Sequence, residues 1–546
     1  MNLFPITVSL DTLIMMIVVT ILNAGALSLI SFKLVHMLQG GGYRTNPYID
    51  AAYDKRIRYF NRLFSLGLLA IGAMIIVNTI FYQFTDIPAL SYLGFLFYAY
   101  LVTMFLIKLF RERIKIPLRF TPRVIRLYIT IFILCALFTF YFIMLGLALP
   151  WYGHIGFSLI AIIPILLPSI VLLANYIMWP IEASIRQHYI RRAKRKLNSA
   201  EYRDVIRVGI TGSYGKTSCK NILVKMLAQK YNVAASPSSY NTPMGFALTI
   251  NNVLQPGHEI LVFEMGLRYR RDIKQLCKLF QPQHGILTAV GSQHIETMGS
   301  LEAIKAEKSE LVRALPEKGI AILNGDSTRC AEVFSETTLK NKYLTTLETH
   351  AANIAVTSDG ATFDLIIDGE TVSVKTQLLG EHSIQNIAMC AEMAYRLGIT
   401  REQIATAISE LEPIPHRLQL IKSSNGVTIL DDSYNASEHG TRAALAVLEL
   451  FDGKRVVQTP GIIEQGTNAD EVNFKLGYHI AKVADACIIM NRTNREALRD
   501  GLRAGGMDPA KIETADNIDM AKTLYPKILA PGDTLLIAND LPDNFS

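Results

Sequence analysis

The sequence predicts a chain in two parts: a bundle of about five membrane-spanning α-helices, followed by two α/β domains. Charged residues make up only 18% of the 546 residues and hydrophobic residues 50%, whereas soluble domains carry about 25% charged residues. Long apolar stretches precede residue 180, and after Tyr202 short β-rich runs alternate with helical patterns, as in open α/β sheets. So much apolar surface excludes a disordered chain. We expect domains at residues 1–198, 199–415 and 416–546.

The first third contains five apolar stretches, each reaching the roughly 20 residues that a helix needs to cross a bilayer core of about 30 Å. They lie at 13–32, 63–84, 91–110, 127–149 and 155–178. The first could instead be a signal peptide, but no basic segment precedes it and no cleavage site is evident. The notable polar residues inside the stretches are Asn23, Asn78 and Asn175. Because transporters usually place ionisable groups near the midplane, this pattern favours an anchor or a lipid-facing platform.

Loop charges predict the orientation of these helices. Lys and Arg cluster after the first, third and fifth stretches, whereas segments 83–88 and 150–154 contain none. Since positive loops stay in the cytoplasm, we expect the N-terminus outside and everything after residue 178 inside. The tract 185–197, IRQHYIRRAKRKL, predicts a basic helix along the inner leaflet or an ordinary positive flank, and the two are compatible. The six cysteines are scattered, which argues against a disulfide framework or a structural zinc site.

A glycine-rich loop opens the second part. A β-rich run at 205–210 precedes TGSYGKTS, and a helical pattern follows at 219–229. Strand, glycine turn and helix form the context of a phosphate-binding loop, although glycine turns before helices also serve purely structural roles, and the strict motif needs Gly where Ile210 stands. Backbone N–H groups and a lysine would hold phosphates. The predicted nucleotide-binding residues here are Thr211, Gly212, Ser213, Tyr214, Gly215, Lys216, Thr217 and Ser218.

Three further residues are candidates for chemistry. Glu264 ends a predicted strand at 260–263, and His294 follows another at 285–290, at the sheet edge where ligands bind in α/β folds. Alone, each would more often be a surface acid or a structural histidine. Lys308 lies on a predicted helix at 301–313 among several other charges, so a solvated helix face is its default interpretation.

At this point the sequence resembles the Mur ligase family, the ATP-dependent amide ligases of peptidoglycan precursor synthesis, and most of all the branch that adds D-alanyl-D-alanine. The resemblance rests on several separated motifs in the family's order. They are TGSYGKTS (211–218), SYNTPMG (239–245), EMG (264–266), GSQHIETMGSLEAIKAEKSEL (291–311), ILNGD (322–326), LLGEHSIQNIAMCAEMA (378–394), HRLQLI (416–421) and ILDDSYNAS (429–437). They span about residues 205–440, and their combination is specific although each piece alone is not.

The resemblance implies the roles of particular residues. In the family a Glu and a His hold two Mg²⁺ ions, and a lysine carbamylated by CO₂ completes the shell of the second one. By motif, the metal-site residues are Thr217, Glu264, His294 and carbamylated Lys308, and the catalytic residues are Lys216, His294 and Lys308. Nucleotide contacts fall on Asn241, Asn386, Arg417 and Asp432, the last two from the third domain, and substrate contacts on Tyr434 and Asn435. The expected cofactors are therefore ATP and two Mg²⁺ ions.

Departures from the family pattern bear on the substrate. The family's HN is His382-Ser383 here, its usual DDSYNANP gives way to Ala436-Ser437-Glu438, and its LGDMxELG is replaced at 459–466. The apolar segment stands in place of the family's uridine-nucleotide-binding domain.

We therefore expect a membrane-anchored ligase of cell wall biogenesis with membrane lipids and a lipid-linked or envelope acceptor as partners, an amino acid or dipeptide as the amine, and no nucleic acid. Two alternatives stay open: ordinary D-alanyl-D-alanine addition to a soluble UDP-MurNAc-peptide with the helices as anchor only, or a nucleotide-driven transporter.

Overall fold

The computed structural model describes residues 9–53, 59–84, 92–111, 117–148, 158–237, 240–434, 437–463, 465–490, 492 and 494–539. The chain divides into two compact units between Ile185 and Arg186, and each is described by itself. The predicted substrate residue Asn435 lies outside the described residues.

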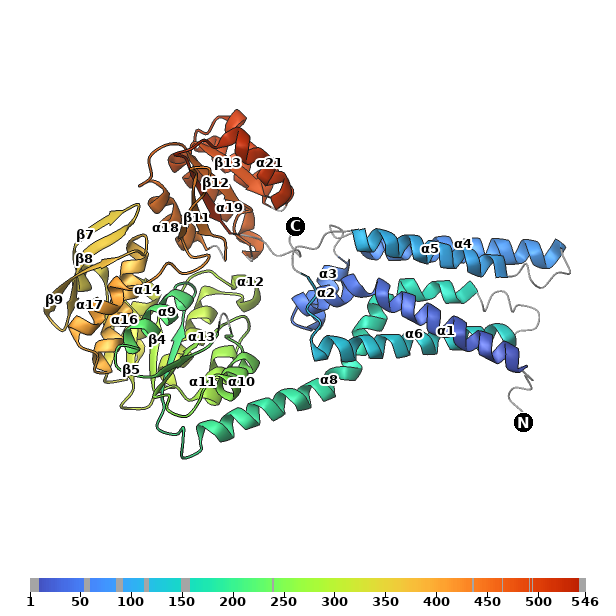
Figure 1. Ribbon diagram of the computed structural model, residues 1–546, viewed down its shortest axis with the longest axis horizontal. Helices are drawn as coiled ribbons and strands as arrows, with labels where there is room; N and C mark the ends of the chain where they lie inside the picture. Colours follow the sequence, from blue (N-terminus) through green and yellow to red (C-terminus); the bar gives the residue numbers. More distant parts are fainter. Residues whose placement is uncertain are drawn as a thin grey trace. The chain divides into compact units, whose positions relative to one another are not determined.

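The N-terminal unit is entirely helical in its described part (Figure 1). Its elements are α1 (Leu10–Ile30), α2 (Phe32–Gly40), α3 (Thr45–Tyr53), α4 (Tyr59–Phe84), α5 (Tyr92–Arg111), α6 (Pro122–Ala148) and the short η2 (Leu159–Ile162), which runs into α8 (Ile163–Leu197). Long helices thus stand at all five predicted stretches, and α2 and α3 are additions. Among the described residues, three segments have the length and hydropathy for a bilayer crossing: Leu13–Ile30, Pro122–Ala148 and Leu159–Leu197.

Asn23, one of the polar residues inside this unit, is paired with two other side chains. The Asn23 amide donates to Thr139 Oγ1 at 2.9 Å and accepts from the Tyr98 hydroxyl at 3.0 Å. Such pairing offsets the cost of burying polar atoms in an apolar core. Near the end of the apolar part of α8, Arg126 Nε donates to Glu182 Oε1 at 2.8 Å, so this carboxylate is compensated as well.

The middle domain is built on a six-stranded parallel sheet in the order β2-β3-β1-β4-β5-β6. Its strands are β1 (Ile206–Thr211), β2 (Val233–Ala235), β3 (Ile260–Glu264), β4 (His284–Leu287), β5 (Ile320–Asn324) and β6 (Lys342–Thr345). Its helices are α9 (Lys216–Leu227), α10 (Pro243–Asn252), α11 (Asp272–Phe280), α12 (Ile295–Met298), α13 (Leu301–Arg313), α14 (Thr328–Glu336), α15 (Leu347–His350), α16 (Glu381–Arg396) and α17 (Arg401–Ser409). An antiparallel sheet of β7 (Ala351–Thr357), β8 (Gly360–Ile367) and β9 (Glu370–Thr376) is appended.

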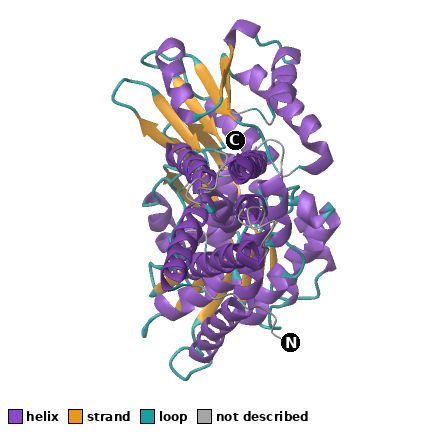
Figure 2. Cartoon of the chain, turned by 90° about the vertical axis from the view of Figure 1, so that its right-hand side faces the viewer, coloured by secondary structure: helices purple, strands orange, loops and turns teal. Residues whose placement is uncertain are grey.

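The C-terminal domain contains a second six-stranded sheet, in the order β10-β11-β15-β12-β13-β14, and Figure 2 shows strands layered with helices in this part of the chain. Its strands are β10 (Gln419–Lys422), β11 (Thr428–Asp432), β12 (Arg455–Thr459), β13 (Ala486–Met490), β14 (Ile512–Ala515) and β15 (Thr534–Ala538). Its helices are α18 (Glu438–Leu448), α19 (Ala469–Val483), α20 (Arg495–Ala504) and α21 (Ile518–Ile528), with the single turns η3 (Gly466–Asn468) and η4 (Pro509–Lys511). Only β10 pairs antiparallel, with β11. The expected open α/β sheet is confirmed.

The basic tract after the apolar helices is the C-terminal end of α8, and it packs against the middle domain. Ala193 and Leu197 are buried in one core with Phe246 and Ile250 of α10. Lys196 Nζ donates to the Leu254 carbonyl at 2.6 Å, just beyond the end of α10, where a cation is favourable for the helix dipole. The apolar side of this tract therefore faces protein. The exposed side carries Arg186, Arg191, Arg192, Lys194 and Arg195.

Candidate functional site

The glycine loop joins β1 to α9, as the sequence predicts. Gly215 adopts a left-handed conformation with φ of 80°, which glycine tolerates best, and α9 begins at the next residue. A side chain at Gly212 would overlap Thr288 Oγ1, so the loop backbone passes directly over the end of β4. The Ser213 hydroxyl accepts a hydrogen bond from Gly291 N at 2.8 Å. These contacts hold the loop open at the N-terminus of α9, where backbone N–H groups favour an anion.

Lys216 lies within this loop and folds back on it. Its Nζ donates to the Gly212 carbonyl at 2.7 Å. Burial lowers the pKa of Lys216 to about 8, with Glu264 opposing the shift and Arg417 adding to it. The nearby Glu264 thus offsets only part of the effect of burial on Lys216. A negatively charged ligand in the loop would stabilise the ammonium further.

Thr217 and Glu264 form the core of the predicted metal site. Thr217 Oγ1 donates to Glu264 Oε2 at 2.8 Å, and Glu264, at the end of β3, is 3% exposed. Two residues on, Gly266 N donates to the Asn241 carbonyl at 3.1 Å, and a Cβ at Gly266 would stand 2.7 Å from Asn241 Cγ. Asn241 therefore lies beside the Glu264 strand end, as predicted for a nucleotide-site residue.

Lys308 is buried, so its default interpretation as part of a solvated helix face is wrong. It is 1% exposed, because α13 packs this face toward the sheet while Glu307 accepts hydrogen bonds from Arg271 N at 2.8 Å and Ile273 N at 3.0 Å, at the start of α11. Burial lowers the pKa of Lys308 well below its usual value, and the nearby Lys216 ammonium lowers it further. Burial and the positive charge of Lys216 therefore both favour the neutral form of the Lys308 amine.

His294 begins the short helix α12 with φ of 67°, in the segment that follows β4. Gly291 of this segment packs against the loop: a Cβ there would stand 3.4 Å from Tyr214 Cε1. Gln293 Oε1 is buried without a hydrogen-bond partner in the described part of the chain. His294 therefore belongs to the segment that contacts the glycine loop through Gly291.

The residues present fit a magnesium ion. Within the described ranges, no group of three or more His, Cys, Asp or Glu side chains is arranged to hold a metal by itself. Mg²⁺ usually takes one or two protein ligands and completes its shell with substrate phosphates and water. The paired oxygens of Thr217 and Glu264 beside a phosphate-binding loop match that requirement.

The C-terminal domain contributes two of the predicted nucleotide residues. Arg417 stands between His416 and Leu418, both of which adopt left-handed backbone conformations with φ of 61° and 46°, at the predicted boundary. Its guanidinium lies 4.4 Å from the centre of the Tyr434 ring. Burial raises the pKa of Asp432 to about 7, while Arg417 opposes that shift. The positive charge of Arg417 thus influences the pKa of Asp432 in its own domain and that of Lys216 in the middle domain.

Asn386, on α16, also reaches the glycine loop. Its Oδ1 accepts from Cys219 Sγ at 3.3 Å, and a Cβ at Gly215 would stand 2.8 Å from the same oxygen. The neighbouring Gln385 Nε2 donates to Asn324 Oδ1 at 2.7 Å, which ties the ILNGD segment to this helix. No sequence periodicity singles out Gln385 and Asn324; only their place within the family motifs could have found them.

One contact was missed entirely. The ring of Tyr214, in the glycine loop, stacks on the ring of His439 in the first turn of α18, with centroids 4.6 Å apart and planes 16° from parallel. The residues are more than 200 positions apart, so no local pattern could predict it.

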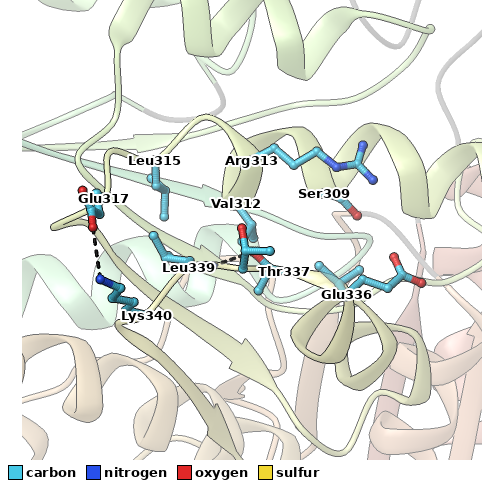
Figure 3. A pocket seen from close by; sticks show the side chains of 11 residues that line it. Ser309, Val312, Arg313, Leu315, Glu317, Glu336, Thr337, Leu339 and Lys340 are labelled. Carbon is cyan, nitrogen blue, oxygen red and sulfur yellow. Dashed lines mark hydrogen bonds and ion pairs between the residues drawn. The ribbon is translucent and has the colours of Figure 1, made fainter.

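A separate groove of about 400 Å³ opens between α13, α14 and the segment leading into β6 (Figure 3). Its lining includes Arg313, Glu336 and Lys340, and none of the predicted site residues lines it. It is distinct from the nucleotide site.

Comparison with known families agrees with this geometry. The model of the Mur ligase middle domain matches residues 210–394, and that of the Mur ligase, glutamate ligase domain matches residues 416–539. Among curated proteins, the UDP-N-acetylmuramoyl-tripeptide–D-alanyl-D-alanine ligase of Mycobacterium bovis is 31% identical over 60% of this chain and 69% of its own. The Escherichia coli ligase of the same name is 30% identical over 50% of this chain, and the match spans only 61% of its own length.

Solved structures show the same fold. MurF from Thermotoga maritima in complex with ADP superimposes with a TM-score of 0.58 and 26% identity, covering 65% of this chain and 80% of that one. MurF from Acinetobacter baumannii gives the same TM-score at 22% identity, over 66% and 78%. With two family domains in order and a curated relative matched over more than two thirds of its length, the chain belongs to the Mur ligase family of ATP-dependent acid–amino-acid ligases.

Proposed function

We propose that this chain is a membrane-anchored ATP-dependent ligase that forms an amide bond. The observation that carries the proposal is the grouping around the glycine loop. Thr217 donates a hydrogen bond to Glu264 at 2.8 Å, Lys216 Nζ donates to the Gly212 carbonyl at 2.7 Å, and Lys308 is only 1% exposed. An anion-binding loop, a carboxylate–hydroxyl pair for Mg²⁺ and cations on two domains are what phosphoryl transfer from ATP requires.

The roles of the residues follow from their chemistry. Gly212–Gly215 and Lys216 would hold the phosphates, and Thr217, Glu264 and His294 would hold Mg²⁺. When bound, Mg²⁺ would neutralise charge on the transferring phosphoryl group. A free ammonium at Lys308 would repel the ion, whereas a neutral amine would react with CO₂, release one proton and give a carbamate whose anionic oxygens suit the ion. The low pKa of Lys308, caused first by burial, is the condition for that reaction.

In the proposed reaction an acceptor carboxylate attacks the γ-phosphate of ATP and forms an acyl phosphate, releasing ADP. The amine of an amino acid or dipeptide then attacks the acyl carbon, forms the amide and expels phosphate. Arg417 and Asp432 complete the nucleotide site from the C-terminal domain, and Tyr434 and Asn435 are the proposed substrate residues. Closure of this domain over the middle domain would exclude water from the acyl phosphate.

The N-terminal helices supply the membrane anchor in this proposal. Their outer faces expose large apolar side chains, such as Leu22 at 67%, Leu69 at 65% and Leu137 at 61%, which is unfavourable in water but not in lipid. None of the buried polar residues in the described part of this unit is Asp, Glu, Lys, Arg or His. That composition supports an anchor rather than a transporter.

The acceptor is the least constrained part of the proposal. The curated relatives are named for addition of D-alanyl-D-alanine to a UDP-N-acetylmuramoyl-tripeptide, and the chain spans 61–69% of the length of the first of them. We propose a lipid-linked or envelope precursor, because confinement to one membrane raises the effective concentration of such an acceptor. Addition to the soluble precursor, with the helices only as anchor, is the second candidate, favoured by those relatives.

The test is ligation by the full chain reconstituted in lipid nanodiscs. D-alanyl-D-alanine and ATP are supplied with either the soluble UDP-linked tripeptide or the same tripeptide on a polyprenyl diphosphate. Faster product formation with the lipid-linked acceptor supports the proposed substrate, and equal rates contradict it. ATP turnover with neither acceptor nor amine present, but stimulated by a transported solute, would contradict the ligase itself.

A further inference from the structure

The contact between Tyr214 and His439 joins the phosphate loop of one domain to the C-terminal domain. Tyr214 stands two residues before Lys216 in the loop, and His439 is the second residue of α18. Their rings lie face to face, 4.6 Å apart at 16°. Such aromatic pairs contribute about 0.5–1.5 kcal/mol beyond the area that they bury.

The loop side of this contact is fixed. The Tyr214 carbonyl accepts a hydrogen bond from Thr288 Oγ1, and its ring edge packs on Gly291, where a Cβ would stand 3.4 Å from Tyr214 Cε1. Tyr214 is therefore held from two directions by the segment after β4. Its ring presents a defined face to the other domain.

The α18 side is fixed further along the helix. Leu379 of the middle domain is 4% exposed and is buried in one core with Leu445 and Leu448 of α18. At the neighbouring Gly380, a Cβ would stand 2.9 Å from Val447 Cγ2. The end of α18 is thus attached to the middle domain by apolar packing, while its first turn reaches the phosphate loop through His439.

The same arrangement brings cations of the two domains together. The positive charge of Arg417, in the C-terminal domain, lowers the pKa of Lys216 in the loop, and like charges repel one another unless an anion lies between them. A favourable contact between the two domains near the loop opposes that repulsion. The stacked rings of Tyr214 and His439 are such a contact.

We propose that Tyr214 and His439 are positioning residues that hold the C-terminal domain against the phosphate loop, so that Arg417 can meet the γ-phosphate of ATP. The inference rests on the proposed use of ATP at this loop. It predicts a specific pattern. Contacts to the β-phosphate come from the loop alone, whereas the γ-phosphate gains a contact from the other domain. Losing the stack should therefore weaken binding of the triphosphate more than binding of ADP.

The experiment measures Mg²⁺-dependent binding of ADP and of the non-hydrolysable analogue AMP-PNP to the full chain in nanodiscs, by calorimetry. The dissociation constant of ADP divided by that of AMP-PNP measures the affinity that the γ-phosphate adds. We call this ratio the γ-phosphate gain. We expect His439→Ala and Tyr214→Ala to reduce this gain roughly 2- to 12-fold, the value of one aromatic pair at 1.4 kcal/mol per factor of ten. The double variant should lose no more than either single variant, because one contact is removed in each case.

Two further variants separate positioning from simple damage. His439→Phe keeps a flat ring over Tyr214 and should retain the gain. His479→Ala removes a histidine of the same domain that lies edge-on to its neighbour Tyr478 at 6.0 Å, and it should leave the gain unchanged. If Tyr214→Ala disturbs the loop and weakens ADP binding as well, the γ-phosphate gain of His439→Ala is compared with that of His439→Phe. A loss of gain in the first variant alone supports the positioning role.

Additive losses in the double variant, or equal losses of ADP and AMP-PNP affinity in His439→Ala, would overturn the inference. Failure of the proposed function looks different, since the wild-type chain would then bind neither nucleotide with Mg²⁺.

Discussion

Replacing Lys308 by Met should stabilise the protein while abolishing ligation. Lys308 is 1% exposed, and burial holds its pKa well below the usual value of 10.5. Between the lowered folded pKa and the unfolded pKa of 10.5, the unfolded state binds more protons than the folded state, so stability rises with pH. The penalty that Lys308 imposes is therefore larger at lower pH and fades as the pH approaches 10.5.

The magnitude follows from this linkage. Each pH unit changes the free energy of unfolding by about 1.4 kcal/mol while the two states differ by one proton. Lys308→Met, which fits a similar volume without a polar head, should stabilise the protein at pH 7.5. Between pH 7.5 and 9.5 the stabilisation should shrink by at most about 2.7 kcal/mol, the limit that one proton sets over two pH units. For a domain of this size each kcal/mol corresponds to about 2–4 °C in Tm.

The assay is differential scanning calorimetry of the detergent-solubilised full chain in CO₂-depleted buffer at both pH values. Lys278→Met is the matched control, since Lys278 is exposed on α11 and should change stability by less than about 0.5 kcal/mol. Bicarbonate should raise the Tm of the wild-type chain and not of Lys308→Met, if the amine forms a carbamate. Destabilisation by Lys308→Met, or a stabilisation that is equal at pH 7.5 and 9.5, would refute the reasoning.

Three further substitutions test other parts of the site and its attachment. Glu264→Gln keeps an acceptor for Thr217 but removes the charge that raises the pKa of Lys216, so the Mg²⁺ concentration needed for AMP-PNP binding should rise roughly tenfold; an unchanged Mg²⁺ dependence would exclude Glu264 from the metal site. Gly266→Ala places a Cβ 2.7 Å from Asn241 Cγ and should cost about 1–3 kcal/mol and weaken ADP binding, measured by calorimetry; unaltered ADP affinity would show that Asn241 does not contact nucleotide. Leu197, which is 4% exposed, packs between α8 and α10, so Leu197→Ala should leave a cavity that costs about 2–5 kcal/mol. The loss should appear as faster amide hydrogen exchange in α10, whereas Asn198→Ala, at an exposed position, should leave the exchange unchanged. Equal exchange in both variants would mean that α8 does not support α10.

Much of the fold was predictable because its patterns are local. The helix at 301–313 was predicted at its observed bounds, since its charged and apolar residues recur with a helical period. The loop residues and Glu264 were also predictable, because chain order places them at one edge of a parallel sheet.

What the sequence could not provide depends on tertiary packing. Lys308 stands among charged neighbours, and only the packing of α13 against the sheet and α11 shows that Glu307 and Lys308 turn inward. The contact of Tyr214 with His439 joins residues from separate domains. Both features depend on packing that no window of sequence reports. The antiparallel sheet β7-β8-β9 is different: Val372 and Val374 of β9 alternate with polar residues after Asp368-Gly369, so a local hairpin signal was present and was not used.

The central claim is that the catalytic unit activates a carboxylate with ATP, and isotope transfer tests it most directly. The full chain is given ATP, an amine and an acceptor peptide whose reacting carboxylate carries ¹⁸O, and the released phosphate is analysed by mass spectrometry. Passage through an acyl phosphate predicts ADP as the nucleotide product and one ¹⁸O atom in each phosphate released. Release of unlabelled phosphate during amide formation, or of AMP and pyrophosphate, would contradict the account.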